Sequence, residues 1–369
     1  MSRRSDFRME TRRDCLLCGA IGEVLYHNLC DQRHDVPGRY GMLRCPRCGL
    51  VWLSPRPRPD ELRRCYPRDY AAYHQPPAAV PCWRPAGGAR DAMRALILSE
   101  VLGYTKFRRE SWWAPILGHL LARVPSMRTR ATFGWQELCP PYQPGGTLLD
   151  IGCGAGTYLS RVRELGWEVV GVDLSPQAAQ TAREAYGIAV HVGTLEEAKF
   201  PDGSFAVVTM THLIEHVPDP LALLRECYRI LQPGGRLIVT TPNFSGMASR
   251  LFGQDWFGLE PPRHLSLFTP STLRRCTELA GFLVARQRSR SWHGPLHFEW
   301  SLGIRRIGHI RELMRVPSAG RLARTLATVE RGLLPLWRGA GNELMLCAVK
   351  RPDRASNQPG SYENDAYRH

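Results

Sequence analysis

Short apolar runs alternate with longer segments of helical spacing along the middle of the chain. Short apolar runs bounded by glycine, proline or polar residues are typical of buried strands, and apolar positions spaced by three and four are typical of helices. Strands are expected at residues 147–151, 168–172, 189–192, 205–210 and 236–241. Helices are expected between them, one ending near residue 165 and others covering 178–186 and 221–231. The alternation predicts an α/β fold in which helices cover both faces of a parallel sheet.

The same pattern predicts how the rest of the chain is divided. Helical spacing recurs at 91–138 and 301–340, a helix and a strand are expected at 271–279 and 282–286, a final strand at 343–349, and a turn at Pro233-Gly234-Gly235. We therefore expect a small module at 1–73, a linker and helical segment at 74–138, the α/β domain at 139–350 with a helical insertion at about 295–340, and a disordered tail at 351–369. No apolar run is long enough to span a membrane, and the basic N-terminus lacks the apolar stretch of a secretory signal, which predicts a cytoplasmic protein.

The most informative motif follows the first expected strand. Asp150 stands two residues before a loop that has glycine at alternate positions, Gly152, Gly154 and Gly156. Glycine allows positive φ and the close approach of a ligand, and an acid at the loop entrance would repel a pyrophosphate but suit a cationic group such as an amine. A second acid, Asp173, ends the second expected strand, where a carboxylate can accept both hydroxyls of a ribose.

Strand, acid, glycine loop, helix, strand and acid in this order resemble the class I S-adenosylmethionine (SAM)-dependent methyltransferases over residues 145–245. The resemblance implies a Rossmann-like methyltransferase fold with SAM as the cofactor. It also implies the residues that bind SAM, which are Asp150, Gly152, Gly154, Gly156, Asp173, Leu174, Thr194, Leu195 and His212. A dinucleotide-binding domain and a glycine turn without a ligand are the alternatives.

Two later segments carry titratable side chains after expected strands. Glu215 and His216 follow the fourth strand, where His216 is a candidate base that Glu215 would orient; the alternative is that the pair caps the next helix.

Arg263 and His264 follow the fifth strand in a segment rich in aromatic residues and proline. Arg263 is a candidate for binding a phosphate or carboxylate, and His264 for a base or substrate contact. The alternative is a structured lid in which His264 bonds to the backbone.

Four of the twelve cysteines form two C-x2-C pairs near the N-terminus, each followed by glycine. The pairs are Cys15–Cys18 and Cys45–Cys48. Two such pairs offer four thiolates to one tetrahedral ion, so we predict a zinc ribbon. Because the protein supplies all four ligands, this Zn²⁺ is expected to be structural and not catalytic. Two unrelated thiol pairs are the alternative.

A zinc ribbon ahead of a SAM-binding domain resembles the sugar C-methyltransferases of deoxysugar pathways. The segment at 256–282 resembles methyltransferases found beside sugar and polysaccharide assembly enzymes. These resemblances imply catalytic or substrate-binding roles for Tyr70, Tyr73, Glu215, His216 and His264. The chain departs from the sugar enzymes after the fifth strand, where it has basic helices and one closing strand in place of a large further domain.

The net charge of +15 raises the alternative of a nucleic-acid partner, but only three of the 49 basic residues are lysine, and the segment 145–245 is acidic. We predict a methyltransferase that acts on a sugar, a glycan or a glycan-lipid intermediate. The alternatives are an rRNA or tRNA methyltransferase, a small-molecule natural-product methyltransferase, and a non-catalytic protein that keeps the fold. The basic helices at 91–138 and 301–340 could also rest on an anionic membrane, although such helices more often pack on the core.

Overall fold

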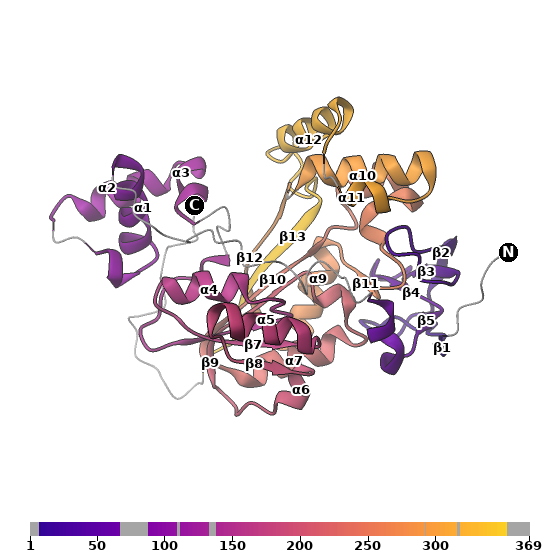
Figure 1. Cartoon of the computed structure of the whole chain (residues 1–369), viewed down its shortest axis with the longest axis horizontal. Helices are drawn as coiled ribbons and strands as arrows, with labels where there is room; N and C mark the ends of the chain where they lie inside the picture. Colours follow the sequence, from indigo (N-terminus) through magenta and orange to yellow (C-terminus); the bar gives the residue numbers. More distant parts are fainter. Residues whose placement is uncertain are drawn as a thin grey trace. The chain divides into compact units, whose positions relative to one another are not determined.

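The computed structural model describes residues 7–66, 88–108, 111–132, 138–291, 293–315 and 318–352. Its largest sheet has seven strands in the order β12-β13-β10-β9-β6-β7-β8 (Figure 1). The strands are β6 (Thr147–Ile151), β7 (Glu168–Asp173), β8 (Val190–Val192), β9 (Phe205–Thr211), β10 (Leu231–Pro242), β12 (Leu283–Arg290) and β13 (Glu343–Val349). Each of them overlaps a strand that the apolar pattern predicts, and the predicted α/β fold is confirmed.

Parallel pairing explains why these strands were visible in the sequence. β6 pairs in parallel with β7 and β9, and β7 pairs in parallel with β8. Leu148 lies opposite Val207 and Leu149 opposite Val208, and all four side chains are almost completely buried. Strands that are covered on both faces form continuous apolar runs. Parallel pairing also brings the carboxyl ends of β6, β7 and β9 to one edge of the sheet, where the ligand-binding loops of α/β proteins begin.

The predicted turn at Pro233–Gly235 is wrong, because these residues lie within strand β10. The Gly234 N–H donates to the carbonyl of Lys350 (N···O 3.0 Å), and the Lys350 N–H donates to the carbonyl of Gly235 (2.9 Å). Gly234 has a φ of 76°, which glycine adopts without strain. The chain therefore bends at Gly234 while it stays paired with the residue that follows β13.

The expected helical segments are also present. The helices are α1 (Ala89–Glu100), α2 (Ala114–Ala122), α3 (Pro125–Ala131), α4 (Thr157–Glu164), α5 (Pro176–Tyr186), α6 (Leu195–Ala198), α7 (Pro220–Ile230), α8 (Met247–Phe252), α9 (Pro270–Leu279), α10 (Gly294–Ile307), α11 (Arg311–Arg315) and α12 (Arg321–Leu333). In α5, the N-cap Ser175 accepts the N–H of Ala178, and the left-handed Gly187 ends the helix. Among the described residues, no helix is long and apolar enough to cross a membrane.

The chain forms two compact units, each made from several stretches of the sequence. One comprises Met1–Tyr70, Thr211–Arg225 and Val239–Leu346, and the other comprises Ala71–Met210, Glu226–Ile238 and Cys347–His369. We call them the ribbon unit and the glycine-loop unit. The glycine-loop unit has a core that includes Tyr104, Leu148 and Trp167. The ribbon unit has its own core, in which Met42 and Leu53 join Trp256 and Phe298.

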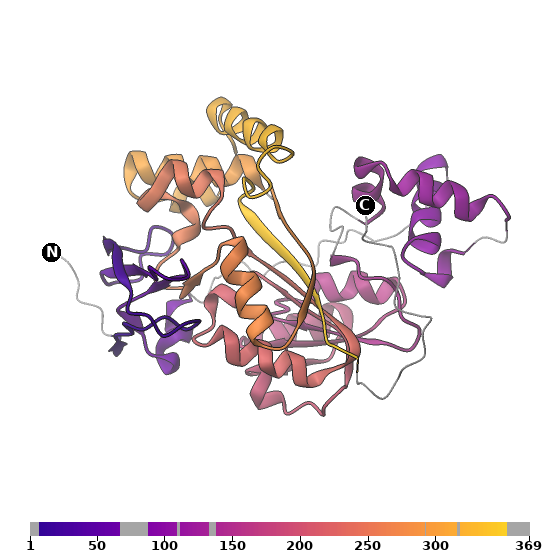
Figure 2. The ribbon, with the colours of Figure 1, turned by 180° about the vertical axis from the view of Figure 1, so that it is seen from behind.

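Within the ribbon unit, the N-terminal module shares a sheet with a segment from the second half of the chain. This sheet has the order β11-β4-β3-β2, with β2 (Glu23–Leu29), β3 (Tyr40–Arg44), β4 (Val51–Leu53) and β11 (Ser266–Leu267) (Figure 2). β4 pairs antiparallel with β11, so that Trp52 lies opposite Ser266 and Val51 opposite Leu267. β1 (Met9–Glu10) and β5 (Arg56–Pro57) form a separate two-stranded sheet. The segment that follows β10 is therefore bonded directly to the ribbon.

Candidate functional site

The glycine loop connects the end of β6 to the start of α4. Gly152, Gly154 and Gly156 have φ values of 73°, 53° and 78°, which residues with a side chain rarely adopt. At Gly156, the residue before α4, an added Cβ would also lie 2.9 Å from the Cβ of Ala182. The loop thus requires glycine and presents bare backbone at the carboxyl edge of the sheet.

Two buried carboxylates accompany this loop. The Asp173 carboxylate accepts the N–H of Gly154 and the N–H of Ser175, both at 2.8 Å. The Asp150 carboxylate accepts the hydroxyl of Thr209 at 2.7 Å. Burial raises the pKa of Asp150 to about 7, and the charge of Asp173 adds to this effect. Burial also raises the pKa of Asp173.

These pKa values indicate a site that lacks positive charge. Within the described residues, the hydrogen bonds to Asp150 and Asp173 come from backbone N–H groups and a hydroxyl, and none comes from a basic side chain. A bound cation would stabilise both carboxylates and lower their pKa values. SAM carries an ammonium group and a sulfonium, so its chemistry fits the two acids and the glycine loop.

The residues predicted to flank the adenine lie after β7 and β8. Leu174 exposes 41% of its surface, and Leu195 is buried at the first position of α6. The Thr194 hydroxyl accepts the N–H of Glu197 (3.2 Å), and the Glu197 carboxylate accepts the N–H of Thr194 (2.7 Å). This capping box is visible in the sequence as T-x-x-E, and it uses the Thr194 side chain. The adenine contacts themselves stay predictions.

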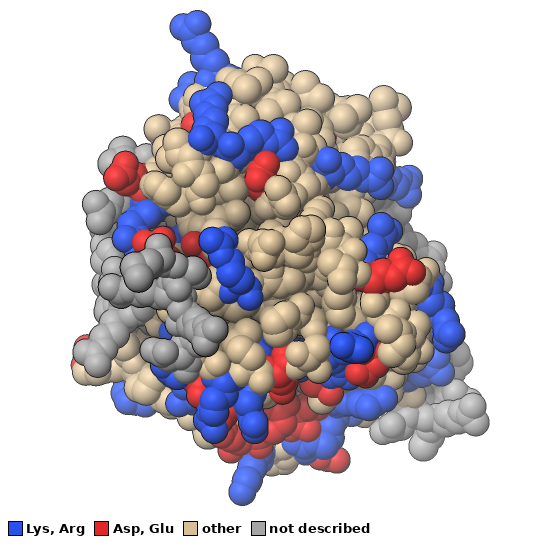
Figure 3. All heavy atoms as spheres, turned by 90° about the vertical axis from the view of Figure 1, so that its right-hand side faces the viewer, with Lys and Arg blue, Asp and Glu red and all other residues tan. Residues whose placement is uncertain are grey.

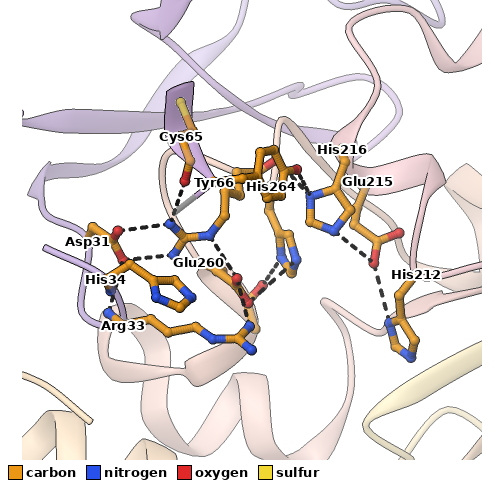
Figure 4. Close-up of polar contacts among 12 residues, drawn as sticks. Asp31, Arg33, His34, Cys65, Tyr66, His212, Glu215, His216, Glu260 and His264 are labelled. Atoms are coloured by element: carbon orange, nitrogen blue, oxygen red, sulfur yellow. Dashed lines mark hydrogen bonds and ion pairs between the residues drawn. The ribbon is translucent and has the colours of Figure 1, made fainter. Parts of the chain in front are cut away.

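His212 lies between two buried glutamates of the ribbon unit, and Figure 4 shows its contact with Glu215. Its Nε2 lies 2.7 Å from Glu343 Oε1, and its Nδ1 lies 3.3 Å from Glu215 Oε1. Burial alone would lower the pKa of His212, but the contacts with Glu215 and Glu343 raise it to about 10. His212 is therefore a cation at neutral pH, and its predicted contact with the cofactor stays a prediction.

His216 and His264 lie edge to face, with ring centroids 4.7 Å apart. His216 Nδ1 lies 3.1 Å from the carbonyl of Arg263, and His264 Nδ1 lies 2.8 Å from the carbonyl of Gly258. A carbonyl can only accept, so in each ring Nδ1 carries a proton that it donates. Burial and the neighbouring His264 lower the pKa of His216 to about 4, so this imidazole is neutral at pH 7.

Glu215 and His216 do not cap the helix that follows them. They lie in a short 3-10 helix (Ile214–His216), and the cap of α7 is Asp219, whose carboxylate accepts the Ala222 N–H at 3.0 Å. Glu215 Oε2 accepts the hydroxyl of Thr241 at 2.9 Å. Glu215 Oε1 is buried and accepts no hydrogen bond. Its nearest neighbours are the two imidazoles, with His212 Nδ1 at 3.3 Å and His216 Nε2 at 4.0 Å.

Arg263 forms a buried ion-pair network with the N-terminal module. Its guanidinium donates two hydrogen bonds to the Asp31 carboxylate, at 2.7 and 2.8 Å, and one to Glu260 at 2.9 Å. Arg33 donates to the same Glu260 oxygen at 2.9 Å. The predicted role of Arg263 in binding a substrate anion is wrong, because the side chain is completely buried and paired with the protein's own carboxylates. The alternative prediction, that His264 forms a hydrogen bond with the backbone, is confirmed by its contact with the Gly258 carbonyl.

The tyrosines predicted to contact the substrate, Tyr70 and Tyr73, lie outside the described residues. Tyr66, which follows a 3-10 helix at Pro59–Cys65, is described, and its hydroxyl lies 3.0 Å from His216 Nδ1. A tyrosine from the N-terminal module therefore does reach the histidine pair.

The four cysteines of the two C-x2-C pairs come together as predicted. Their sulfur atoms all lie within 4.8 Å of one another, with Cys15–Cys48 and Cys18–Cys45 at 3.4 Å. The N–H of Cys48 donates to the Cys45 sulfur at 3.3 Å. The N–H of Leu17 likewise donates to the Cys15 sulfur at 3.4 Å. Four sulfur ligands at these separations, two of them accepting a backbone N–H, fit a structural Zn²⁺ with tetrahedral geometry.

Basic residues do not form one continuous patch on the face shown in Figure 3. Lys and Arg are scattered among uncharged residues, and Asp and Glu lie between several of them. Proteins that bind RNA through its phosphates usually concentrate basic side chains on one face. This face therefore does not add support to the RNA alternative.

Comparisons with known proteins support the methyltransferase fold that the glycine loop indicates. Residues 127–287 match a family described as a methyltransferase domain. The ubiquinone biosynthesis O-methyltransferase of Aeromonas salmonicida is 32% identical over 172 residues, which are 43% of this chain and 71% of that protein. The enzyme of the same name from Xanthomonas campestris pv. campestris (strain B100) is 39% identical over 106 residues, 27% of this chain and 44% of that protein. This chain thus spans less than half the length of the Xanthomonas relatives.

Solved structures with similar folds are more distant. A chain from the complex of the Haloferax volcanii Trm112 methyltransferase activator with a methyltransferase is 23% identical, with a TM-score of 0.43 and coverage of 63% of this chain and 95% of that chain. A SAM-dependent methyltransferase from Archaeoglobus fulgidus is 21% identical, with a TM-score of 0.40 and coverage of 62% of this chain and 94% of that chain.

The Aeromonas relative is matched over more than two thirds of its length, and the family match at residues 127–287 contains the glycine loop with both of its buried acids. The chain therefore belongs to the class I SAM-dependent methyltransferases.

Proposed function

We propose that the protein is an enzyme that transfers the methyl group of SAM to an oxygen atom of a small molecule. The observation that carries this proposal is the pair of buried carboxylates, Asp150 and Asp173, beside the glycine loop. Neither acid has a basic partner among the described residues, so both favour a cationic ligand. The choice of an oxygen acceptor on a small molecule rests on the names of the matched relatives.

In this proposal the protein's own residues hold the cofactor in a fixed orientation. Asp150 binds the ammonium end, Asp173 binds the ribose hydroxyls, and Leu174, Thr194 and Leu195 surround the adenine. SAM, when bound, supplies a methyl group on a positively charged sulfur. The acceptor oxygen forms a bond to the methyl carbon while the carbon–sulfur bond breaks and its electron pair goes to sulfur. The acceptor proton must leave as well, so a group that favours the deprotonated oxygen accelerates the reaction.

The segment after β9 is the proposed place for the acceptor. In the class I methyltransferases that residues 145–245 resemble, the residues after the fourth strand lie beside the transferred methyl group. His212, Glu215 and His216 follow β9 directly, and His264 packs on His216. In the neutral tautomer that donates Nδ1–H to these carbonyls, Nε2 of His216 and of His264 has the lone pair that this chemistry needs. Tyr70 and Tyr73 are retained as acceptor contacts.

Labelled SAM and an extract of cells that lack the protein would test this function. The extract is separated into small molecules, nucleotide sugars, lipid-soluble glycans and RNA before it is incubated with purified protein. We expect label in the small-molecule fraction with the wild type. The Asp150→Ala variant should leave this fraction unlabelled, because the substitution removes the proposed contact with the ammonium group of SAM. Asp202→Asn is the matched control, because Asp202 is exposed on the same unit and pairs with Arg229.

Other outcomes would point to other acceptors. Label in nucleotide sugars or glycans would favour the sugar hypothesis, which the zinc ribbon and the segment at 256–282 support by resemblance. Label that ribonuclease removes would favour RNA. Equal labelling by the wild type and Asp150→Ala would contradict the proposed cofactor site.

A further inference from the structure

We propose that Glu215, His216 and His264 form a second metal site, which holds one divalent transition-metal ion apart from the Zn²⁺ of the four cysteines. One carboxylate and two imidazoles are a common ligand set for such ions. All three residues belong to the ribbon unit, and their side chains expose 0%, 14% and 7% of their surface.

The donor atoms are close enough to share an ion. One ligand atom from each of the three residues lies within 4.8 Å of the other two. Glu215 Oε1 and His216 Nε2 are 4.0 Å apart. Ligands that bind one ion at about 2.1 Å lie about 3–4 Å from each other. Small side-chain shifts would therefore complete the coordination.

The second polar atom of each proposed ligand forms a hydrogen bond with the protein, as is usual in metal sites. Histidine ligands usually donate their second ring N–H to a carbonyl or carboxylate, which aims the free nitrogen at the metal. His216 donates Nδ1–H to the carbonyl of Arg263, and His264 donates Nδ1–H to the carbonyl of Gly258. Glu215 Oε2 accepts the hydroxyl of Thr241. Each of the three ligands thus has an outer partner that orients it.

Within the described part of the chain, the atoms aimed inward make only longer ion-pair contacts, between 3.3 and 4.0 Å. Glu215 Oε1 is buried, and its nearest basic neighbour, His212 Nδ1, lies 3.3 Å away without hydrogen-bond geometry. A buried carboxylate oxygen without a hydrogen bond is costly unless a charge compensates it. On the other side, Glu260 Oε2 lies 3.9 Å from His264 Nε2, and the other oxygen of this carboxylate is paired with Arg33 and Arg263 (Figure 4). A divalent cation would satisfy Glu215 Oε1 and both imidazole lone pairs together.

The use of this metal rests on the proposed function. Three protein ligands leave at least one coordination position open, as in catalytic and not structural sites. An acceptor hydroxyl bound there would lose its proton to water more readily, because a metal ion lowers the pKa of a bound oxygen acid. The acceptor class would then be a hydroxyl compound that can coordinate a metal.

Metal binding can be measured without SAM or acceptor. Full-length protein with zinc in its ribbon is dialysed against increasing Co²⁺, and the metal content per chain is measured by mass spectrometry. The absorption spectrum distinguishes Co²⁺ bound to nitrogen and oxygen from Co²⁺ that replaces zinc at sulfur. We expect one Co²⁺ per chain in addition to the ribbon metal, without sulfur-to-cobalt charge transfer. Glu215→Gln and His264→Gln should each weaken this binding by about tenfold or more.

His297→Gln is the matched control, because His297 is a buried histidine of the same unit that is not a ligand. It should bind Co²⁺ as the wild type does, and thermal melts show whether each variant is folded. A wild type that binds only the ribbon metal overturns the proposal, as do folded ligand variants with unchanged Co²⁺ affinity. If Co²⁺ binds as expected but no small-molecule acceptor is methylated, the metal site stands and the proposed function fails.

Discussion

At the scale of residues, the charge of Asp150 depends on whether its ligand is present. Without a cation, burial holds its pKa near neutrality, so a fraction of the protein has a neutral carboxyl group at this position. Binding of a cation requires the carboxylate, and the proton must therefore leave when the ligand binds. The affinity for SAM is consequently coupled to pH.

We predict that SAM binds about tenfold more weakly at pH 6 than at pH 8. The pKa of Asp150 is about 7 in the ligand-free protein, so protonation competes with the ligand below this pH. Calorimetric titration at several pH values would measure the effect. In Asp150→Asn, which keeps an oxygen that can accept from Thr209, this difference should disappear and binding should be weak throughout. The same pH dependence in the variant would show that another group is responsible.

Residues within short motifs could be identified from the sequence, and residues that meet across the fold could not. The glycines, Asp150, Asp173 and the four cysteines each stand at a fixed spacing that has a direct physical meaning. Asp31, Glu260 and Glu343 have no such spacing, and each is paired with a residue that lies far away in the chain. The sequence predicts that Arg263 binds a substrate anion, because nothing in the sequence shows that Asp31 is its neighbour in the fold.

At the scale of elements, the buried parallel strands β6, β7 and β9 were predicted almost completely, whereas β10 was predicted only in part and the two-residue strand β11 was not predicted. A strand of two residues is too short to show a periodic pattern. Ser266 and Leu267 form a strand only because β4 provides an edge with which they can pair. Helix α6 is also too short for a periodic signal, although its capping box marks its start. Elements that depend on a distant partner lack a local signal, whereas elements that bury both faces have one.

We predict that Arg263→Met destabilises the protein by about 3–5 kcal/mol, because it leaves Asp31 and Glu260 buried without their main cation. Chemical denaturation followed by tryptophan fluorescence would measure the change. Arg274→Met is the matched control, since Arg274 is partly exposed and pairs with Glu278 on the surface of α9. The control should change stability by less than about 0.5 kcal/mol. Equal effects of the two changes would contradict a structural role for the buried pair.

At the scale of the whole molecule, the metal of the ribbon and the histidine pair belong to one compact unit. The domain boundary predicted after residue 73 remains a prediction, but the ribbon strands take part in a sheet with β11. Leu53 N–H also donates to the carbonyl of Leu265, next to His264. The zinc ribbon therefore supports the backbone that carries one of the proposed ligands.

We predict that loss of zinc loosens the segment around β11. In Cys18→Ser, amide hydrogen exchange should become faster in peptides that contain Val51–Leu53 and in peptides that contain Ser266–Leu267, because the two strands protect each other. Peptides from β6 and β7 in the glycine-loop unit serve as the internal control. Unchanged exchange at Ser266–Leu267, together with faster exchange at the cysteines, would show that the ribbon unfolds independently.

The pairing of β4 with β11 also has a consequence for folding during synthesis. Val51, Trp52 and Leu53 leave the ribosome long before Ser266 and Leu267, by about 10–40 s at ordinary rates of translation. During that interval β4 is an apolar edge strand without its neighbour, and such edges pair readily with other chains. We therefore expect that the nascent chain is most prone to aggregate after the ribbon has bound zinc and before residue 267 has emerged.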